Sequence, residues 1–239
     1  MSYYSAERRC RHDRTATAFT LVELLTVIAI MALLSTILIP TASGARTAAV
    51  RTRTRIQFSQ WAVAIEAFRQ EYGGYPAFAA TGKVNGAASV SPGEAHPFHD
   101  LLAGRRRDGS ALPAARLDAA ADPAPPEVQN FRRIPFITFT ENDLFPAVGG
   151  DDTRSNLLHD GFANTDIAVL VDRNMDGLIN AEDYPELPAV SPPGNGSRQL
   201  TPADQDFPGG SSGGVRAGVL FYCAPPQAVD ASQLILSWR

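Results

Sequence analysis

Residues 15–40 read TATAFTLVELLTVIAIMALLSTILIP, and this stretch decides the fold. Its central part, 19–39, is a run of 21 residues that is almost wholly apolar and carries one charge, Glu23. At about 1.5 Å per helical residue the run is roughly 30 Å long, the thickness of a bilayer's hydrocarbon core. The sequence therefore predicts a transmembrane helix that ends near Pro40.

Glu23 is the exception inside this run. A carboxylate in such a segment costs on the order of 2.5–3.5 kcal/mol on insertion scales, so Glu23 needs a partner. No basic residue lies within two turns on its apolar side. A cut between Ala18 and Phe19 would create an α-amino group one turn from Glu23, and the amino group of a neighbouring copy is a second candidate. We therefore expect Glu23 to act in assembly.

A short basic leader, a small residue and Phe-Thr-Leu-Val-Glu-Leu before an apolar helix resemble the class III signal of type IV pilins and type II secretion pseudopilins. The resemblance implies that a prepilin peptidase cuts after Ala18 and methylates the new amino group of Phe19. It also implies that Glu23 is used in subunit docking. The family usually has Gly where this chain has Ala18. EYGGYP at 71–76 and LILSW at 234–238 resemble the helix end and the last strand of pseudopilins.

The resemblance implies a structural subunit of a type II secretion pseudopilus that serves protein export, and not an enzyme. Its expected partners are copies of itself, other pseudopilins, the prepilin peptidase and the inner-membrane assembly platform. The expected location is the bacterial inner membrane, crossed once, with the C-terminal head in the periplasm or otherwise outside the cytoplasm. The alternatives are a type IV pilus subunit, or a periplasmic calcium-dependent binding domain on a plain membrane anchor. A further alternative is that the N-terminal segment is an ordinary secretory signal that is cut near 43–45.

Composition narrows the class of partner. The formal net charge of the 239 residues is −4, which argues against a nucleic-acid partner and is compatible with bound cations. Cys10 lies in the expected leader, so Cys223 would be the only cysteine of the processed chain and no intramolecular disulfide is expected.

The rest of the chain predicts an α+β, pilin-like fold in which one long helix, half transmembrane and half amphipathic, packs on a small antiparallel sheet. The amphipathic half should end at Gly73-Gly74. We divide the chain into a leader (1–18), a transmembrane half (19–40), an amphipathic half (41–75) and a globular head (76–239). Within the head we expect a short helix over 97–103 and strands over 134–140, 167–171, 215–222 and 233–238.

Residues 172–183, DRNMDGLINAED, fit the calcium-loop pattern D-x-[DN]-x-[DN]-G. Oxygen ligands at alternate positions converge on one cation because Gly177 permits a sharp turn. The loop ends in Asp rather than Glu, which resembles dockerin-type loops. The alternative is an acidic turn that needs no metal. The predicted ligands of a structural Ca²⁺ are the side chains of Asp172, Asn174, Asp176, Asn180 and Asp183 and the backbone carbonyl of Leu178.

Two further groups of residues are weaker candidates. His96 and His99 are three residues apart, but Pro97 lies between them, and we interpret them as a polar loop pair rather than a zinc site. Arg105, Arg106 and Arg107 are interpreted as a solvated loop. The sequence contains no nucleophile or phosphate-binding motif, so nothing in it predicts catalysis.

Overall fold

The computed structural model describes residues 19–78, 82–86, 88–114, 124–146, 153–208 and 213–239, and within the first helix it leaves the side chains of 37–43 undescribed. The chain divides into two compact units whose boundary lies between Thr47 and Ala48, and we treat each unit by itself. The elements are α1 (Leu21–Tyr72), α2 (Pro97–Ala103), α3 (Pro126–Gln129), β1 (Ile167–Val171), β2 (Val219–Cys223) and β3 (Ile235–Leu236), with 3-10 turns η1 (Glu141–Asp143) and η2 (Ala231–Gln233).

The sheet is small and antiparallel, with the strand order β1-β2-β3. Val169 lies opposite Phe221 in the β1–β2 pair, and Tyr222 lies opposite Leu236 in the β2–β3 pair. Every residue of the three strands is buried. Both faces of the sheet must therefore be covered by other parts of the chain.

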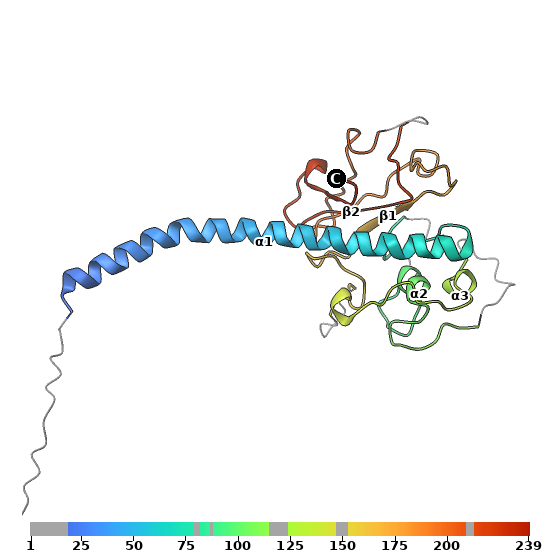
Figure 1. Cartoon of the computed structure of the whole chain (residues 1–239), viewed down its shortest axis with the longest axis horizontal. Helices are drawn as coiled ribbons and strands as arrows, with labels where there is room; N and C mark the ends of the chain where they lie inside the picture. Colours follow the sequence, from blue (N-terminus) through green and yellow to red (C-terminus); the bar gives the residue numbers. More distant parts are fainter. Residues whose placement is uncertain (1–18, 79–81, 87, 115–123, 147–152, 209–212) are drawn as a thin grey trace, which may run out of the picture. The chain divides into compact units, whose positions relative to one another are not determined.

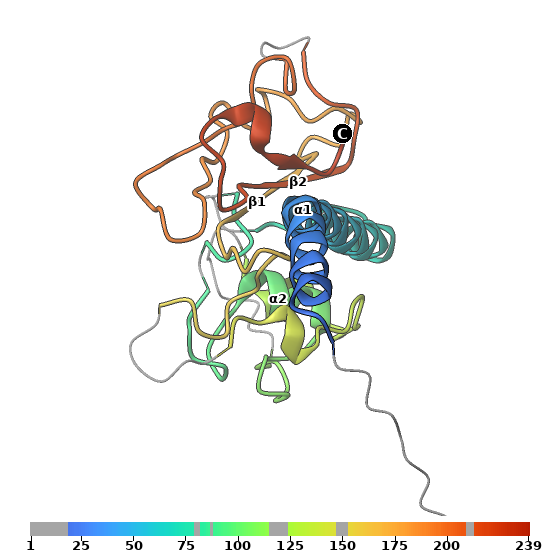
Figure 2. The same ribbon diagram turned by 90° about the vertical axis from the view of Figure 1, so that its left-hand side faces the viewer.

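In the second unit, the C-terminal half of α1 covers one face of the sheet. Figures 1 and 2 show β1 and β2 on one side of this half of α1 and α2 on the opposite side. The aromatic residue Trp61 of α1 reaches both neighbours: its ring centroid lies 5.7 Å from that of Phe221 and 5.3 Å from that of Phe98. This half of α1, the sheet and α2 thus share one hydrophobic cluster.

Loops cover the other face of the sheet. Strand residues alternate between the two faces, so Val169 belongs to the cluster around Trp61, whereas Leu170 belongs to a second cluster. The partners of Leu170 in this second cluster come from the irregular chain after β1 and include Ile179, Val190 and Phe207. Loops therefore act as the outer layer that a second sheet or helix supplies in other α+β folds.

The end of α1 is fixed by the residues that follow it. Gly73 adopts a left-handed φ of 81° and donates its N–H to the carbonyl of Arg69 at 2.8 Å, which ends the helix as the sequence predicts. Tyr75 then turns back and donates its hydroxyl to Glu66 at 2.7 Å. Burial and this bond to Glu66 raise the pKa of Tyr75 above its ordinary value. The EYGGYP segment therefore anchors the helix end to the head.

The predicted transmembrane helix is wrong. Among the described residues, no helix joins enough length to enough apolarity to cross a membrane. This finding overturns the pilin-like fold class in which the long helix has a transmembrane half, and it overturns the single-pass inner-membrane location. What remains is an α+β fold with a three-stranded antiparallel sheet.

The expected strand over 134–140 is also wrong. This segment bends at Phe136 and joins no sheet: the N–H of Phe136 donates to the carbonyl of Leu102 at 2.8 Å, at the end of α2. Its apolar side chains, Phe136, Ile137 and Phe139, pack on the edge of the core instead. The strands expected over 215–222 and 233–238 are present as the shorter β2 and β3, while β1 and α2 have the predicted bounds.

We predict that Trp61→Ala lowers the free energy of unfolding by about 3–5 kcal/mol, because the cavity would open where α1 contacts both β2 and α2. Urea denaturation of the full chain measures this change. Val63→Ala, two residues away and 67% exposed, is the matched control and should change the stability by no more than about 0.5 kcal/mol. Equal effects of the two substitutions would contradict the central position of Trp61.

Candidate functional sites

The first candidate site is the start of α1. Thr20 is the N-cap: its hydroxyl accepts the N–H of Glu23 at 3.2 Å, while Glu23 Oε2 accepts the N–H and the hydroxyl of Thr20, both at 2.8 Å. This reciprocal pair is a capping box. The bonds, that from the Thr20 N–H foremost, hold the pKa of Glu23 below its usual value. Glu23 therefore has a local partner within its own chain.

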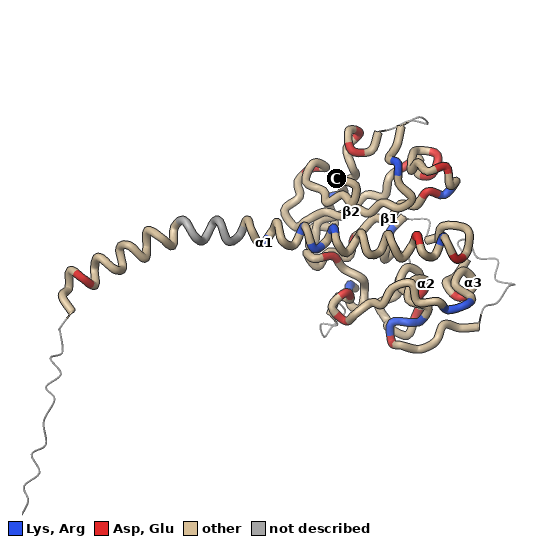
Figure 3. Tube along the Cα trace, in the orientation of Figure 1, with Lys and Arg blue, Asp and Glu red and all other residues tan. Residues whose placement is uncertain are grey.

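The helix beyond this cap presents apolar side chains on all sides. The large apolar residues from Leu21 to Leu34 are between 41% and 77% exposed. In Figure 3 the described start of α1 is uncharged except for one acidic band, which the sequence identifies as Glu23. A helix that is apolar all round is normally buried in a protein interior or a membrane. We therefore expect this apolar surface to be buried against another apolar partner.

The expected cleavage site lies between Ala18 and Phe19, and the structure describes only the second of these residues. Phe19 precedes the cap and is 75% exposed. Ala18 lies outside the described residues.

The second candidate site is the loop after β1, which contains the predicted calcium ligands. Asp172 follows the last residue of β1 and accepts the N–H groups of Asp176 at 3.2 Å and Gly177 at 2.7 Å. At the other end of the loop, Asp183 accepts the N–H of Arg173 at 2.9 Å and that of Asn174 at 3.3 Å. The two terminal carboxylates thus close the loop on itself.

The middle of this loop is a series of side chain–backbone turns. Asn174 accepts the N–H of Asp176 at 3.0 Å, Asp176 accepts that of Leu178 at 2.8 Å, and Asn180 accepts that of Glu182 at 2.6 Å. Gly177 has a left-handed φ of 84°, which glycine adopts without a steric cost. The middle of the loop is therefore held by hydrogen bonds from backbone N–H groups to side chains two residues earlier.

The donor set suits a hard cation. It consists of three carboxylates, two amide oxygens and a carbonyl, the oxygen ligands that Ca²⁺ takes. Each carboxylate has about four lone-pair sites, so the N–H groups it already accepts leave others for a cation. In the described chain, however, no three His, Cys, Asp or Glu side chains converge as a metal-ligand group. The residues fit Ca²⁺ by chemistry, while the carboxylates here bind backbone N–H groups.

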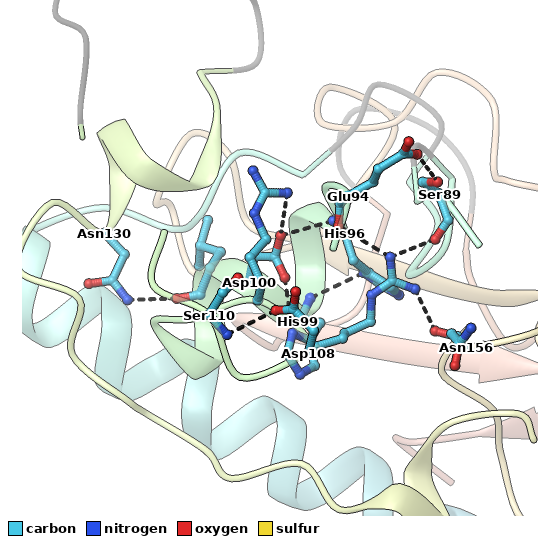
Figure 4. A network of polar contacts seen from close by, with 12 residues as sticks. Ser89, Glu94, His96, His99, Asp100, Asp108, Ser110, Asn130 and Asn156 are labelled. Atoms are coloured by element: carbon cyan, nitrogen blue, oxygen red, sulfur yellow. Dashed lines mark hydrogen bonds and ion pairs between the residues drawn. The ribbon is translucent and has the colours of Figure 1, made fainter. Parts of the chain in front are cut away.

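The third group is the buried network of Figure 4, which contains both histidines. His96 caps α2: its Nδ1 lies 3.3 Å from the N–H of His99, and its Nε2 lies 2.9 Å from Asn85 Oδ1. Burial lowers the pKa of His96 well below the ordinary histidine value, which keeps the ring neutral. Because both ring nitrogens are in hydrogen bonds, His96 is held as a structural residue.

Charged groups surround these rings. Asp100 is fully buried and lies 3.0 Å from His99 Nδ1 and 3.2 Å from Arg106 Nη1. Arg107 donates to the carbonyls of Ser89 and Asn156, both at 2.6 Å. The interpretation of this arginine run as a solvated loop is therefore wrong for Arg106 and Arg107, which hold neighbouring segments together.

Sequence reasoning missed two of these roles. The capping box was readable, since Thr20-x-x-Glu23 before an apolar run is its known pattern. The role of Asp100 was also local, since its partners His96, His99 and Arg106 all lie within six residues of it, but no standard motif describes this group.

Comparison with known proteins leaves the chain without an assigned relative: no family model, no curated protein and no solved structure matches it.

Proposed function

We propose that this chain is a non-enzymatic structural subunit of a filament, a type II secretion pseudopilus that serves protein export, and that it assembles through the first part of α1. The observation that carries this proposal is the apolar helical surface of 21–36, whose large side chains are 41–77% exposed. A surface of this kind is far larger than the patches that monomeric soluble proteins expose. Copies of the same helix, and the helices of other pseudopilins, are partners of matching apolarity.

The single carboxylate gives such an assembly its specificity. An unpaired charge buried among apolar helices is strongly penalised, whereas a paired one is tolerated. In the free chain the carboxylate of Glu23 is satisfied by Thr20. In the filament we propose that it also meets the amino group of Phe19 of a neighbouring copy. Only registers that bring this pair together would then be stable.

We also propose that residues 172–183 bind one structural Ca²⁺. The supporting observation is the closed loop in which all five predicted side-chain ligands are oriented by hydrogen bonds to neighbouring N–H groups. Ca²⁺ would be held by these side chains and by the Leu178 carbonyl, and it would neutralise the mutual repulsion of three carboxylates. Its role would be to stiffen the loop that covers the outer face of the sheet.

We predict that the chain isolated from cells with a prepilin peptidase begins with N-methylated Phe19. Mass spectrometry of the intact protein and of its N-terminal peptide measures this. Ala18→Gly should give the same product in at least equal yield, because the family usually has Gly there. A bulky residue, as in Ala18→Phe, should block the cut. Wild-type protein that retains Met1, or that begins near residue 45, would contradict processing at this site.

We predict that Glu23→Gln and Glu23→Ala each lower the yield of sedimentable filaments by at least about tenfold, because both remove the charge that sets the register. Electron microscopy and sedimentation of sheared filaments measure the yield in cells that carry the assembly system.

The pair of substitutions separates the two roles of Glu23. Gln keeps an oxygen that can accept the Thr20 N–H, as Gln does in other capping boxes, whereas Ala removes it. Normal filaments with Gln but not with Ala would reduce Glu23 to a helix cap. Thr20→Ser keeps the N-cap hydroxyl and should assemble like the wild type.

We predict that about 10 mM Ca²⁺ stabilises the full chain by about 1–3 kcal/mol if the loop has the affinity of extracellular calcium modules. For a domain of this size the melting temperature should rise by roughly 3–10 °C relative to EDTA. The control is Asp172→Asn/Asp176→Asn, which keeps oxygen acceptors for the backbone but removes two charges. An equal rise in wild type and control would show that the loop is an acidic turn without a cation site.

A further inference from the structure

We propose that Asn195 is a site of spontaneous deamidation, and that the fold directs this reaction to Asn195 and protects Asn85. The chain has two Asn-Gly steps, Asn85-Gly86 and Asn195-Gly196. They are alike in sequence but lie in opposite surroundings. This inference is independent of the proposed filament.

The reaction sets clear requirements on the structure. The backbone nitrogen of the residue after Asn attacks Cγ, so that a new C–N bond closes a five-membered succinimide. The Cγ–Nδ2 bond breaks, and ammonia leaves with the proton that the attacking nitrogen gives up. Water then opens the ring to aspartate or isoaspartate. The side-chain amide and the next N–H must both be free, and a glycine offers the attacking nitrogen no Cβ obstruction.

Asn195 meets these requirements. It lies in an exposed loop that is closed at its base by two backbone hydrogen bonds between Val190 and Leu200, of 2.8 and 2.9 Å. Within the described residues, no group binds the side-chain amide of Asn195 or the N–H of Gly196. A Cβ added to Gly196 would meet nothing within 4 Å, so the space around the attacking nitrogen is open.

Asn85 is also followed by glycine, but neither of its reacting groups is free. Its Nδ2 donates to the carbonyls of Leu158 at 2.8 Å and Thr165 at 2.6 Å. Its Oδ1 accepts the N–H of Leu158 at 3.1 Å and lies 2.9 Å from His96 Nε2. The following N–H, that of Gly86, donates to the carbonyl of Lys83 at 3.3 Å. Both reacting groups of this step are therefore held, and the attack requires the local fold to open.

The product alters the loop in two ways. It adds one negative charge to a chain whose formal net charge is −4. Isoaspartate also lengthens the main chain between Pro192, whose carbonyl accepts the Asn195 N–H at 3.0 Å, and Arg198, whose N–H donates to the Asn195 carbonyl at 3.2 Å. Arg198 further donates to the carbonyl of Ala228 at 3.1 Å, which links this loop to the chain after β2.

The test is peptide mapping by mass spectrometry of the full chain, incubated for days at 37 °C and mildly alkaline pH. We expect the Asn195 peptide to convert while the Asn85 peptide stays intact, with rates that differ by about a hundredfold, since two or more hydrogen bonds must break before Asn85 can react. In denaturant the two peptides should convert at similar rates. Gly196→Ala introduces a Cβ into open space and should slow conversion at Asn195 without changing the melting temperature.

Two outcomes would overturn the proposal. One is equal conversion of Asn85 and Asn195 in the folded chain, which would mean that the fold exerts no selection. The other is an intact Asn195 in the folded chain alongside conversion of both residues in denaturant, which would mean that the loop is held in a way that blocks the attack.

Discussion

The contact of Trp61 with Phe221 and Phe98 is the interaction on which the rest of the head depends. The sheet has three short strands, and its edges and faces would be exposed without a partner. Trp61 places α1 against β2 and, on the other side of the helix, against α2. Phe98 and Phe221 also contact each other, with ring centroids 6.2 Å apart, so that α1, α2 and β2 meet in one hydrophobic cluster around Trp61. The head can contain many irregular loops because α1 is a long regular element against which they pack.

Side chains replace secondary structure in the irregular half of the head. Asn130 is buried and makes four hydrogen bonds, to Tyr72 at the end of α1, to the Leu101 carbonyl of α2 and to both backbone groups of Ile134. Asn164 donates to the carbonyls of Ser191 and Ala224 in the same manner. Buried backbone groups must find partners, and here amide side chains provide them where no strand does.

The sequence predicted those features that have local causes. β1 and α2 appear with the expected bounds, and α1 ends at Gly73, because a β-branched apolar run, a proline start and a glycine pair each act within a few residues. The calcium pattern did not predict that the carboxylates of this loop accept backbone N–H groups, nor that no three of them converge in the described chain. Residues 134–140 were expected as a strand, yet the N–H groups of Phe136 and Ile137 bond to the Leu102 carbonyl at the end of α2 instead. Hubs such as Asn130 join segments distant in sequence, so no local pattern could reveal them.

The order of synthesis has a consequence for this arrangement. Trp61 is made early, whereas its partner Phe221 and strand β3 lie near the end of the chain, about 160 residues later. At the usual 5–20 residues per second, α1 waits roughly 10–30 s for the strands that bury its apolar face. During that time both the face around Trp61 and the apolar start of α1 are exposed on the nascent chain. The sheet side of this core is therefore covered only after β2 and β3 have been made, so the C-terminal strands act as a late closure of the head.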